Sequence, residues 1–110
     1  MKVPILIIKR LPAAGMAIFP FILLKSAKLK NDPEVINHEK IHIRQQLELL
    51  ILPFYLLYLG HFFINLIKYK NKDLAYRNIS FEREAYTKET DLHYIRNRRM
   101  FQFLHYIKLK

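Results

Sequence analysis

Cysteine is absent from this chain of 110 residues. Disulfide bonds and cysteine-ligated metals are therefore excluded, and any metal ion must bind histidine, aspartate or glutamate. Because a chain without cysteine suits both reducing and oxidising surroundings, the compartment stays open. Internal repeats and low-complexity stretches are absent too. Lys9 and Arg10 interrupt the first apolar run, so we predict no secretory signal peptide.

Acidic residues are scarce: there are 9, against 19 lysines and arginines, which leaves a net charge of +10. Basic chains favour nucleic acids or anionic membrane surfaces as partners. Here the charge is spread along the whole chain and the aromatic residues lie in apolar runs, unlike a stacking platform with a basic groove. We therefore expect no nucleic-acid partner and keep an anionic membrane surface as a candidate.

The first part of the chain favours β-structure. Ile5–Lys9 and Ile18–Lys25 are rich in apolar residues, and Pro12 and Gly15 lie between them as turn residues. We predict that these two runs form a β-hairpin. Proline within a strand is tolerated at a sheet edge, so Pro20 would place the second strand at the edge.

A helix is predicted to begin at Pro33. Asp32 is a suitable N-cap, and proline fits the first helical position. Four apolar residues recur at helical spacing and would face the core: Ile36, Ile43, Leu47 and Leu50. His38 and His42 fall on roughly the opposite side of this helix, which suits a site better than packing.

The segment Leu47–Ile67 is almost continuously apolar and has about the length that spans a bilayer, roughly 20 residues. Pro53 should kink or split it. Two interpretations stay open: two core helices of a soluble domain that meet at Pro53, or a helix that lies on or dips into a bilayer, flanked by Lys68, Lys70 and Lys72. We expect the protein to be membrane-associated or cytoplasmic.

About half of the residues are apolar, which suffices for one domain over residues 1–110. We predict an α+β fold, mostly helical, with an N-terminal hairpin or edge strand followed by three to four helices. The strands occupy residues 1–30, two helices lie in 33–69, and a further helix covers 79–97. Residues 98–110 form a basic amphipathic tail that would clasp the domain, bind a membrane or cover a cleft.

The stretch VINHEKIHIRQQ carries the pattern most informative about chemistry: His38, Glu39 and His42. Histidines four apart on a helix project from the same side and reach one ion at about 2.0–2.1 Å. Glu39, at the adjacent angle, can hold and deprotonate a water on that ion rather than bind the metal itself. A catalytic zinc ion also needs a third protein ligand and an open position.

The third ligand has few candidates. Glu48 stands roughly 9 Å further along a continuous helix, and His61 is expected to be satisfied by a core or interfacial partner. A stripe of four residues lines one face of the helix predicted over 79–97: Glu82, Tyr86, Glu89 and His93. Glu82 and His93 would lie roughly 16 Å apart, so the stripe supplies one ligand only.

This arrangement resembles the gluzincin branch of zinc metallopeptidases, in which the two-histidine motif is followed by a glutamate on a later helix. In that branch a small residue stands three positions after the glutamate, and usually an acid stands four after it. Glu82 has Ala85 and Tyr86 at these positions, whereas Glu84 has Lys88 at plus four. The resemblance therefore assigns the third ligand to Glu82, with Glu84 as runner-up, and gives Tyr86 the hydrogen bond to a zinc-binding histidine.

The resemblance covers residues 18–94 and implies a zincin-like minimal domain, similar in size to minigluzincins. The apolar helices resemble those of membrane-embedded gluzincins and of antirepressor-type sensor peptidases. It implies one Zn²⁺ ion held by His38, His42 and Glu82. Glu39 would be the general base in the hydrolysis of a peptide bond by a metal-activated water, with a peptide or protein as substrate.

The resemblance also implies an edge strand that pairs with an extended peptide substrate, for which the segment FPFILLK is the candidate. Four residues are available to stabilise an oxyanion: Tyr76, Arg77, His93 and Tyr94. Two other functions stay open. One is a zinc-binding, non-catalytic, membrane-associated protein that uses the site for structure or sensing, and the other is a basic binder whose motif is accidental. The presence of Glu39 favours catalysis, because a structural site does not need it.

Overall fold

Three short strands at the N-terminus form one small sheet: β1 (Ile5–Ile7), β2 (Gly15–Ile18) and β3 (Phe21–Leu24). The computed structural model describes residues 3–107. The strand order is β1-β3-β2, with β1 parallel and β2 antiparallel to the central strand β3. The fold is α+β and mostly helical, as predicted.

The predicted pairing of the strands is wrong. The two runs expected to form a hairpin contain β1 and β3, and these pair in parallel. The hairpin consists of β2 and β3. Strand β2 begins at Gly15, which the sequence predicts as a turn residue because glycine is common in turns and depleted in strands. Pro20 lies in the turn between β2 and β3, so it marks no edge, and β3 is the central strand.

Helix α1 (Pro33–Glu48) begins where the sequence predicts. The side chain of Asp32 accepts hydrogen bonds from the backbone N–H groups of Glu34 and Val35, which have no partner within the helix. Of the predicted apolar stripe, Ile36 and Ile43 pack against the sheet.

The other half of that stripe does not face the core. Leu47 and Leu50 are 42% and 81% exposed. Helix α1 ends at Glu48, and the chain turns away before Leu50 can reach the sheet. Beyond Ile43, the side chains of α1 that are buried are those of two glutamines, Gln45 and Gln46, rather than the predicted leucines.

The long apolar run is divided between two helices. Helix α2 (Leu52–Tyr69) begins directly before Pro53, and its axis is bent by 113° relative to α1. This confirms the split predicted at Pro53. In residues 3–107 no single helix is long and apolar enough to cross a membrane, although α1 and α2 taken together as a bent pair meet that criterion by length and composition.

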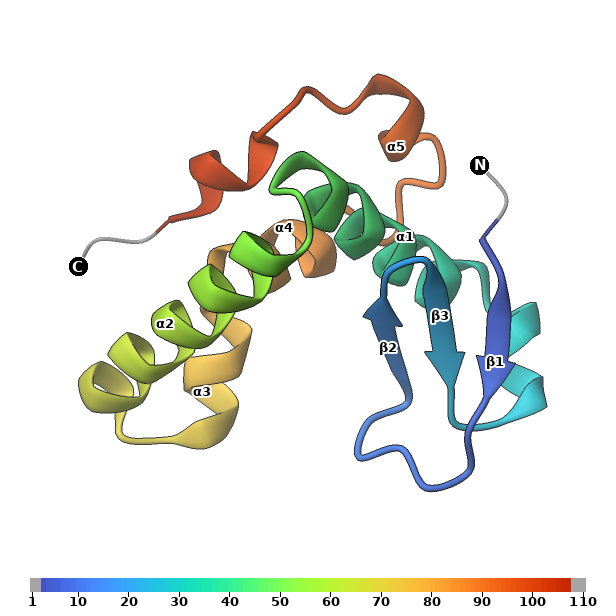
Figure 1. The fold of residues 1–110 in the computed structure, drawn as a ribbon, viewed down its shortest axis with the longest axis horizontal. Coiled ribbons are helices and arrows are strands. Elements are labelled where there is room, and N and C mark those ends of the chain that lie inside the picture. The colour runs from blue at the N-terminus through green and yellow to red at the C-terminus, as the bar shows by residue number, and fades with distance from the viewer. Residues whose placement is uncertain (1–2, 108–110) are drawn as a thin grey trace.

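Three further helices complete the part of the chain that the structure describes: α3 (Lys72–Arg77), α4 (Ser80–Lys88) and α5 (Tyr94–Asn97). Two short 3₁₀ helices lie at Ala27–Asn31 (η1) and Gln102–Tyr106 (η2). In Figure 1 the sheet lies to one side, the α2–α3 pair to the other, and α1 and α4 lie between them. Five α-helices within residues 3–107 exceed the three to four predicted.

The core consists of separate clusters joined by α1 and α4. Phe54, Ile79, Phe81 and Phe103 form one cluster, and Ile22, Leu24 and Ile43 form another beneath the sheet. A third cluster, Ile41, Ala85 and Tyr94, packs α1 against α4 and α5. Helix α1 therefore contacts both sides of the molecule, and its position fixes the histidines relative to α4.

The helix predicted over 79–97 is interrupted. Residues 89–93 separate α4 from α5, and the reason lies on α1. The side-chain amide of Asn37 donates to the carbonyl oxygens of Lys88, Glu89 and Asp91 at 2.9–3.2 Å. These carbonyls thus have partners outside the helix, and the chain is free to turn.

The C-terminal tail clasps the domain, which is one of the three roles predicted for it. Phe103 inserts into the core beside Phe81, and Arg83 of α4 donates to the carbonyl oxygen of Tyr106. Residues 108–110 of the predicted tail lie outside the described residues. The tail is anchored by one buried ring and by bonds to α4.

Candidate metal centre

The side chains of His38, His42 and Glu82 meet between α1 and α4, and all three are buried. The Nε2 atoms of the two histidines are 3.2 Å apart. Glu82 Oε1 lies 3.2 Å from Nε2 of His38 and 3.1 Å from Nε2 of His42. Helix α1 presents the histidines one turn apart, and the first turn of α4 brings Glu82 to them. These residues form a group that can hold one metal ion.

The geometry of this group fits such an ion. Atoms that bind one tetrahedral ion at about 2.0–2.1 Å lie about 3.3–3.4 Å from one another, close to the separations above. His38 Nδ1 is 2.8 Å from Glu89 Oε1, and His42 Nδ1 is 2.8 Å from Gln45 Oε1. Because both partners are acceptors, each Nδ1 donates and each Nε2 keeps its lone pair for the shared centre.

The glutamate ligand is held in place as well. The hydroxyl of Tyr58 on α2 donates to Glu82 Oε2 at 2.6 Å, so Oε1 is left to face the histidines. Sequence reasoning missed the supporting roles of Tyr58, Gln45 and Glu89. Glu89 was part of the predicted stripe, two helical turns after Glu82. Tyr58 and Gln45 carry no signal in the sequence, because their roles depend on how α1, α2 and α4 pack.

The role predicted for Tyr86 is wrong. Its hydroxyl bonds to the hydroxyl of Tyr76 at 2.9 Å and makes no hydrogen bond to a histidine. The ring of Tyr86 instead packs edge-on against the ring of His38, with centroids 4.5 Å apart. The acid that orients His38 is Glu89, which directly follows the last residue of α4 and lies three residues beyond Tyr86.

Glu84, the runner-up for the third ligand, points away from the histidines into a buried network. It accepts hydrogen bonds from Gln45 at 2.9 Å and from the hydroxyl of Tyr94 at 2.7 Å. Arg98 of the tail forms a two-pronged ion pair with Glu84 and also reaches Glu48. The amide oxygen of Gln45 accepts a hydrogen bond from His42. The network therefore links Arg98 of the tail, through Glu84 and Gln45, to the candidate ligand His42.

The two other residues considered as ligands have partners elsewhere. Glu48 is bound by Arg98, and the Nδ1 atom of His61 accepts the backbone N–H of Ser80 at 3.1 Å. His61 is therefore satisfied by a partner within the domain, as predicted. Burial lowers its pKa, which keeps the ring neutral and able to accept that bond.

Charge in the centre is strongly coupled. Burial by itself lowers the pKa of His42, but the carboxylate of Glu82 more than offsets this and raises it to about 9. Burial raises the pKa of Glu82, and the two imidazoles outweigh burial and hold it below its usual range. A buried carboxylate and two imidazoles thus favour a shared positive charge between them, which a proton or a metal ion supplies.

A cleft of about 400 Å³ opens over the centre. Its walls are β2 on one side and α2 on the other, and its floor includes His38, Glu39, His42 and Glu82. Most of the remaining lining is apolar or aromatic: Pro12, Ala13, Met16, Ala17, Ile18, Phe54, Tyr55, Leu59 and Tyr76. The described tail residues, 98–107, contribute nothing to the lining, so the predicted alternative that the tail covers the cleft does not hold for them.

The carboxylate of Glu39 lies on the floor of this cleft, buried at 7% exposure. Among residues 3–107 it has no hydrogen-bond partner, in contrast to the three candidate ligands. A Cβ atom on Gly15 of β2 would come within 3.2 Å of its Oε2, so glycine lets β2 approach the carboxylate closely. Burial raises the pKa of Glu39, and the neighbouring histidines act in the opposite direction.

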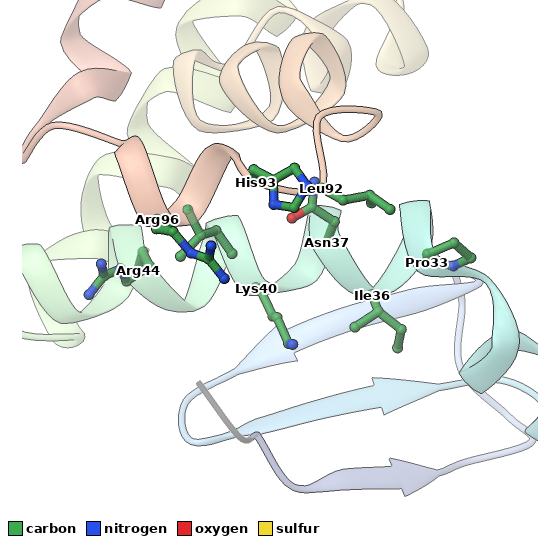
Figure 2. A pocket seen from close by; sticks show the side chains of 9 residues that line it. Pro33, Ile36, Asn37, Lys40, Arg44, Leu92, His93 and Arg96 are labelled. Carbon is green, nitrogen blue, oxygen red and sulfur yellow. The ribbon is translucent and has the colours of Figure 1, made fainter.

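A second hollow lies on the opposite side of α1, between α1 and α5 (Figure 2). It is lined by basic side chains, among them Lys40, Arg44 and Arg96. His93, the last member of the predicted stripe, lies here rather than at the metal centre, because the break at 89–93 turns it away from Glu82. Of the residues that line it, Asn37 is buried and donates to backbone carbonyls, whereas Arg44, His93 and Arg96 are exposed.

The orienting role of Glu89 makes a testable prediction. Replacing Glu89 with alanine is expected to lower the affinity for zinc by about 10- to 100-fold, because His38 loses the acceptor that fixes its tautomer. Tyr86→Phe is the matched control, since the Tyr86 hydroxyl bonds Tyr76 and not His38. Competition titration against a chromophoric chelator measures both affinities. A loss in Tyr86→Phe with none in Glu89→Ala would contradict this assignment.

Comparison of the chain with models of known protein families, with curated proteins and with solved structures finds no match. Function is therefore argued from the site itself, since a fold class alone does not determine an activity.

Proposed function

We propose that the protein is a zinc-dependent peptidase of the gluzincin type, with His38, His42 and Glu82 as ligands and Glu39 as general base. The observation that carries the proposal is the place of Glu39. Its carboxylate lies beside the candidate ligands, is unpaired among residues 3–107, and faces a cleft. The residue is largely buried while its carboxylate lines the cleft, where it can meet a water molecule, and a purely structural metal site would not require a carboxylate there.

The chemistry follows from the residues of the cleft. Bound zinc would polarise the scissile carbonyl and lower the pKa of a water molecule to about 7. Glu39 accepts the proton of the attacking water and passes it to the leaving amine. Because burial raises the pKa of Glu39, its basicity moves closer to the neutral range in which a general base works best.

Tyr76 is the best-placed residue to stabilise an oxyanion. Of the four candidates in the sequence, it alone lines the cleft. Tyr94 donates to Glu84, His93 lies at the second hollow, and Arg77 pairs with Asp73 on the surface. Burial and then the charge of Glu82 raise the pKa of Tyr76, so its hydroxyl stays protonated and able to donate.

The substrate is proposed to bind as an extended peptide along β2. The predicted segment FPFILLK cannot take this role, because it contains the central strand β3. Strand β2 is an edge strand and lines the cleft from Gly15 to Ile18. An exposed edge can accept a peptide by strand addition, while the apolar lining selects its side chains. We expect substrates with a large apolar residue next to the scissile bond.

The experiment that tests this proposal compares zinc-loaded and chelator-treated protein on an unbiased peptide mixture, with products identified by mass spectrometry. We expect cleavage beside large apolar residues, loss of cleavage in the chelator, and recovery when zinc is restored. A folded protein that binds one zinc ion and cleaves no peptide in the mixture would overturn the proposal.

That outcome would favour the second candidate, a non-catalytic zinc protein. The observation in its favour is that the three ligands join α1 to α4 at the middle of a small core. Metal binding in such a place stabilises the fold whether or not catalysis follows. The two candidates share the ligands and differ in the role of Glu39.

A further inference from the structure

One side of helix α2 is apolar and exposed to solvent. Seven large side chains on it are each more than half exposed: Leu52, Leu56, Leu57, Leu59, Phe63, Ile64 and Ile67. Only Phe54 and Asn65 of this helix are fully buried, against the rest of the domain. Soluble monomers rarely expose a contiguous apolar surface of this kind without a partner.

The C-terminal tail extends this surface. Leu104 and Ile107 are 55% and 42% exposed, and together with Leu56, Leu57 and Ile64 they line a shallow hollow of about 560 Å³. These two residues and the seven of α2 are called the apolar face below. The apolar face therefore consists of two segments distant in the sequence that the fold brings side by side.

The charge around the apolar face has one sign. Residues 49–72 and 92–110, which build it, contain three and five lysines or arginines and no aspartate or glutamate. Lys68 lines the hollow, and Lys70 and Lys72 follow at the end of α2, exposed. Three acids of the chain are buried, Glu39, Glu82 and Glu84, against the one arginine side chain, Arg98, that pairs with Glu84, so the described surface is more basic than the net charge suggests.

We propose that α2 docks the protein onto an anionic lipid bilayer, lying in the plane of the interface with the apolar face among the acyl chains and Lys68 and Lys70 at the headgroups. A helix with one apolar side and basic residues at its border binds membranes in this way. Each lysine or arginine near an anionic surface strengthens the attraction. The proposal is independent of peptidase activity.

Two alternatives to this orientation fit less well. A helix that spans the bilayer would be apolar all round, whereas the inner side of α2 packs against the domain and Asn65 donates to the carbonyl oxygen of Ala75. A second copy of the chain seated on the apolar face would bring two molecules of charge +10 together through their basic segments. An anionic bilayer would bury the apolar side chains among its acyl chains and attract the basic residues beside them to its headgroups.

The experiment is sedimentation of the full chain with vesicles of phosphatidylcholine alone or mixed three to one with phosphatidylserine. We expect binding to the mixed vesicles that weakens with salt, and at least tenfold weaker binding to the neutral ones. Leu56→Ser/Phe63→Ser is expected to weaken binding to mixed vesicles at least about tenfold. The matched control Leu6→Ser/Leu92→Ser changes two exposed apolar residues elsewhere and should bind like the wild type.

Circular dichroism and zinc content of each variant establish that the fold and the metal centre are intact, so a loss of vesicle binding reports on the surface alone. Absence of binding by the wild type would overturn the proposal. It would also be overturned by equal losses in the two double variants, or by a stable dimer in solution that Leu56→Ser/Phe63→Ser dissociates. A failure here leaves the peptide-cleavage test unaffected.

Discussion

Replacing Glu39 with glutamine is expected to lower kcat for peptide hydrolysis by about 10²- to 10⁴-fold, the usual contribution of a general base. Glutamine has nearly the same shape and can still fill the space beside Gly15, but its amide cannot accept the proton of the attacking water. The zinc content should remain that of the wild type, because Glu39 is not among the residues that form the candidate metal group.

The measurement is steady-state kinetics together with metal analysis of the same samples. Glu34→Gln is the matched control, since it neutralises an exposed carboxylate in the first turn of the same helix. It should change neither property. If Glu39→Gln lost its zinc, Glu39 would be part of the metal site, and if it kept full activity the proposed mechanism would be wrong.

The parts of the site that the sequence predicts are those set by local geometry. A spacing of four on a helix places His38 and His42 together in any fold that keeps the helix. The capping residues Asp32 and Pro33 predict where that helix begins, and the structure agrees. Glu82 was assigned through the resemblance to a family, and the structure brings it to the histidines.

The parts that the sequence did not predict depend on packing between elements. Glu89 reaches His38 because α4 ends at Lys88, beside α1. There the side-chain amide of Asn37 on α1 donates to the carbonyl oxygens of Lys88 and Glu89. The parallel pairing of β1 with β3 is a long-range choice that periodicity alone cannot distinguish from a hairpin. Arg98 is fifty residues from Glu48 in the sequence, and nothing in the tail indicates that it is buried.

The second large effect is expected at Arg98. Arg98→Met should lower the free energy of unfolding of the metal-free protein by about 3–5 kcal/mol, because it leaves the carboxylate of Glu84 buried without its counter-charge. Glu84 has no exposed surface, and Arg98 binds both of its oxygens. Small domains have a stability of about 5–15 kcal/mol, so this variant would be close to unfolding.

Urea unfolding followed by circular dichroism measures the loss, and Arg77→Met is the matched control. Arg77 pairs with Asp73 on the surface, where water screens both charges. The urea midpoint of Arg77→Met should therefore equal that of the wild type. Arg98→Met/Glu84→Met should regain part of the stability, since the fully buried carboxylate of Glu84 is then removed together with its counter-charge; the recovery is only partial because Glu48 still loses Arg98. Equal midpoints for the two single variants would show that the buried network adds nothing to stability.

The same variants test whether the network supports the metal centre. Gln45 bonds Glu84 through its amide nitrogen and His42 through its amide oxygen, so an orientation imposed by Glu84 is passed on to the imidazole. Arg98→Met is therefore expected to weaken zinc binding as well, by about tenfold, the lower end of the effect of losing a residue that orients a ligand. Arg98→Met/Glu84→Met should stay weak in zinc binding even where its stability recovers, because the amide nitrogen of Gln45 then loses Glu84 and keeps only the carbonyl oxygen of Phe81 as acceptor. If zinc affinity instead followed stability in both variants, the network would act on the fold alone.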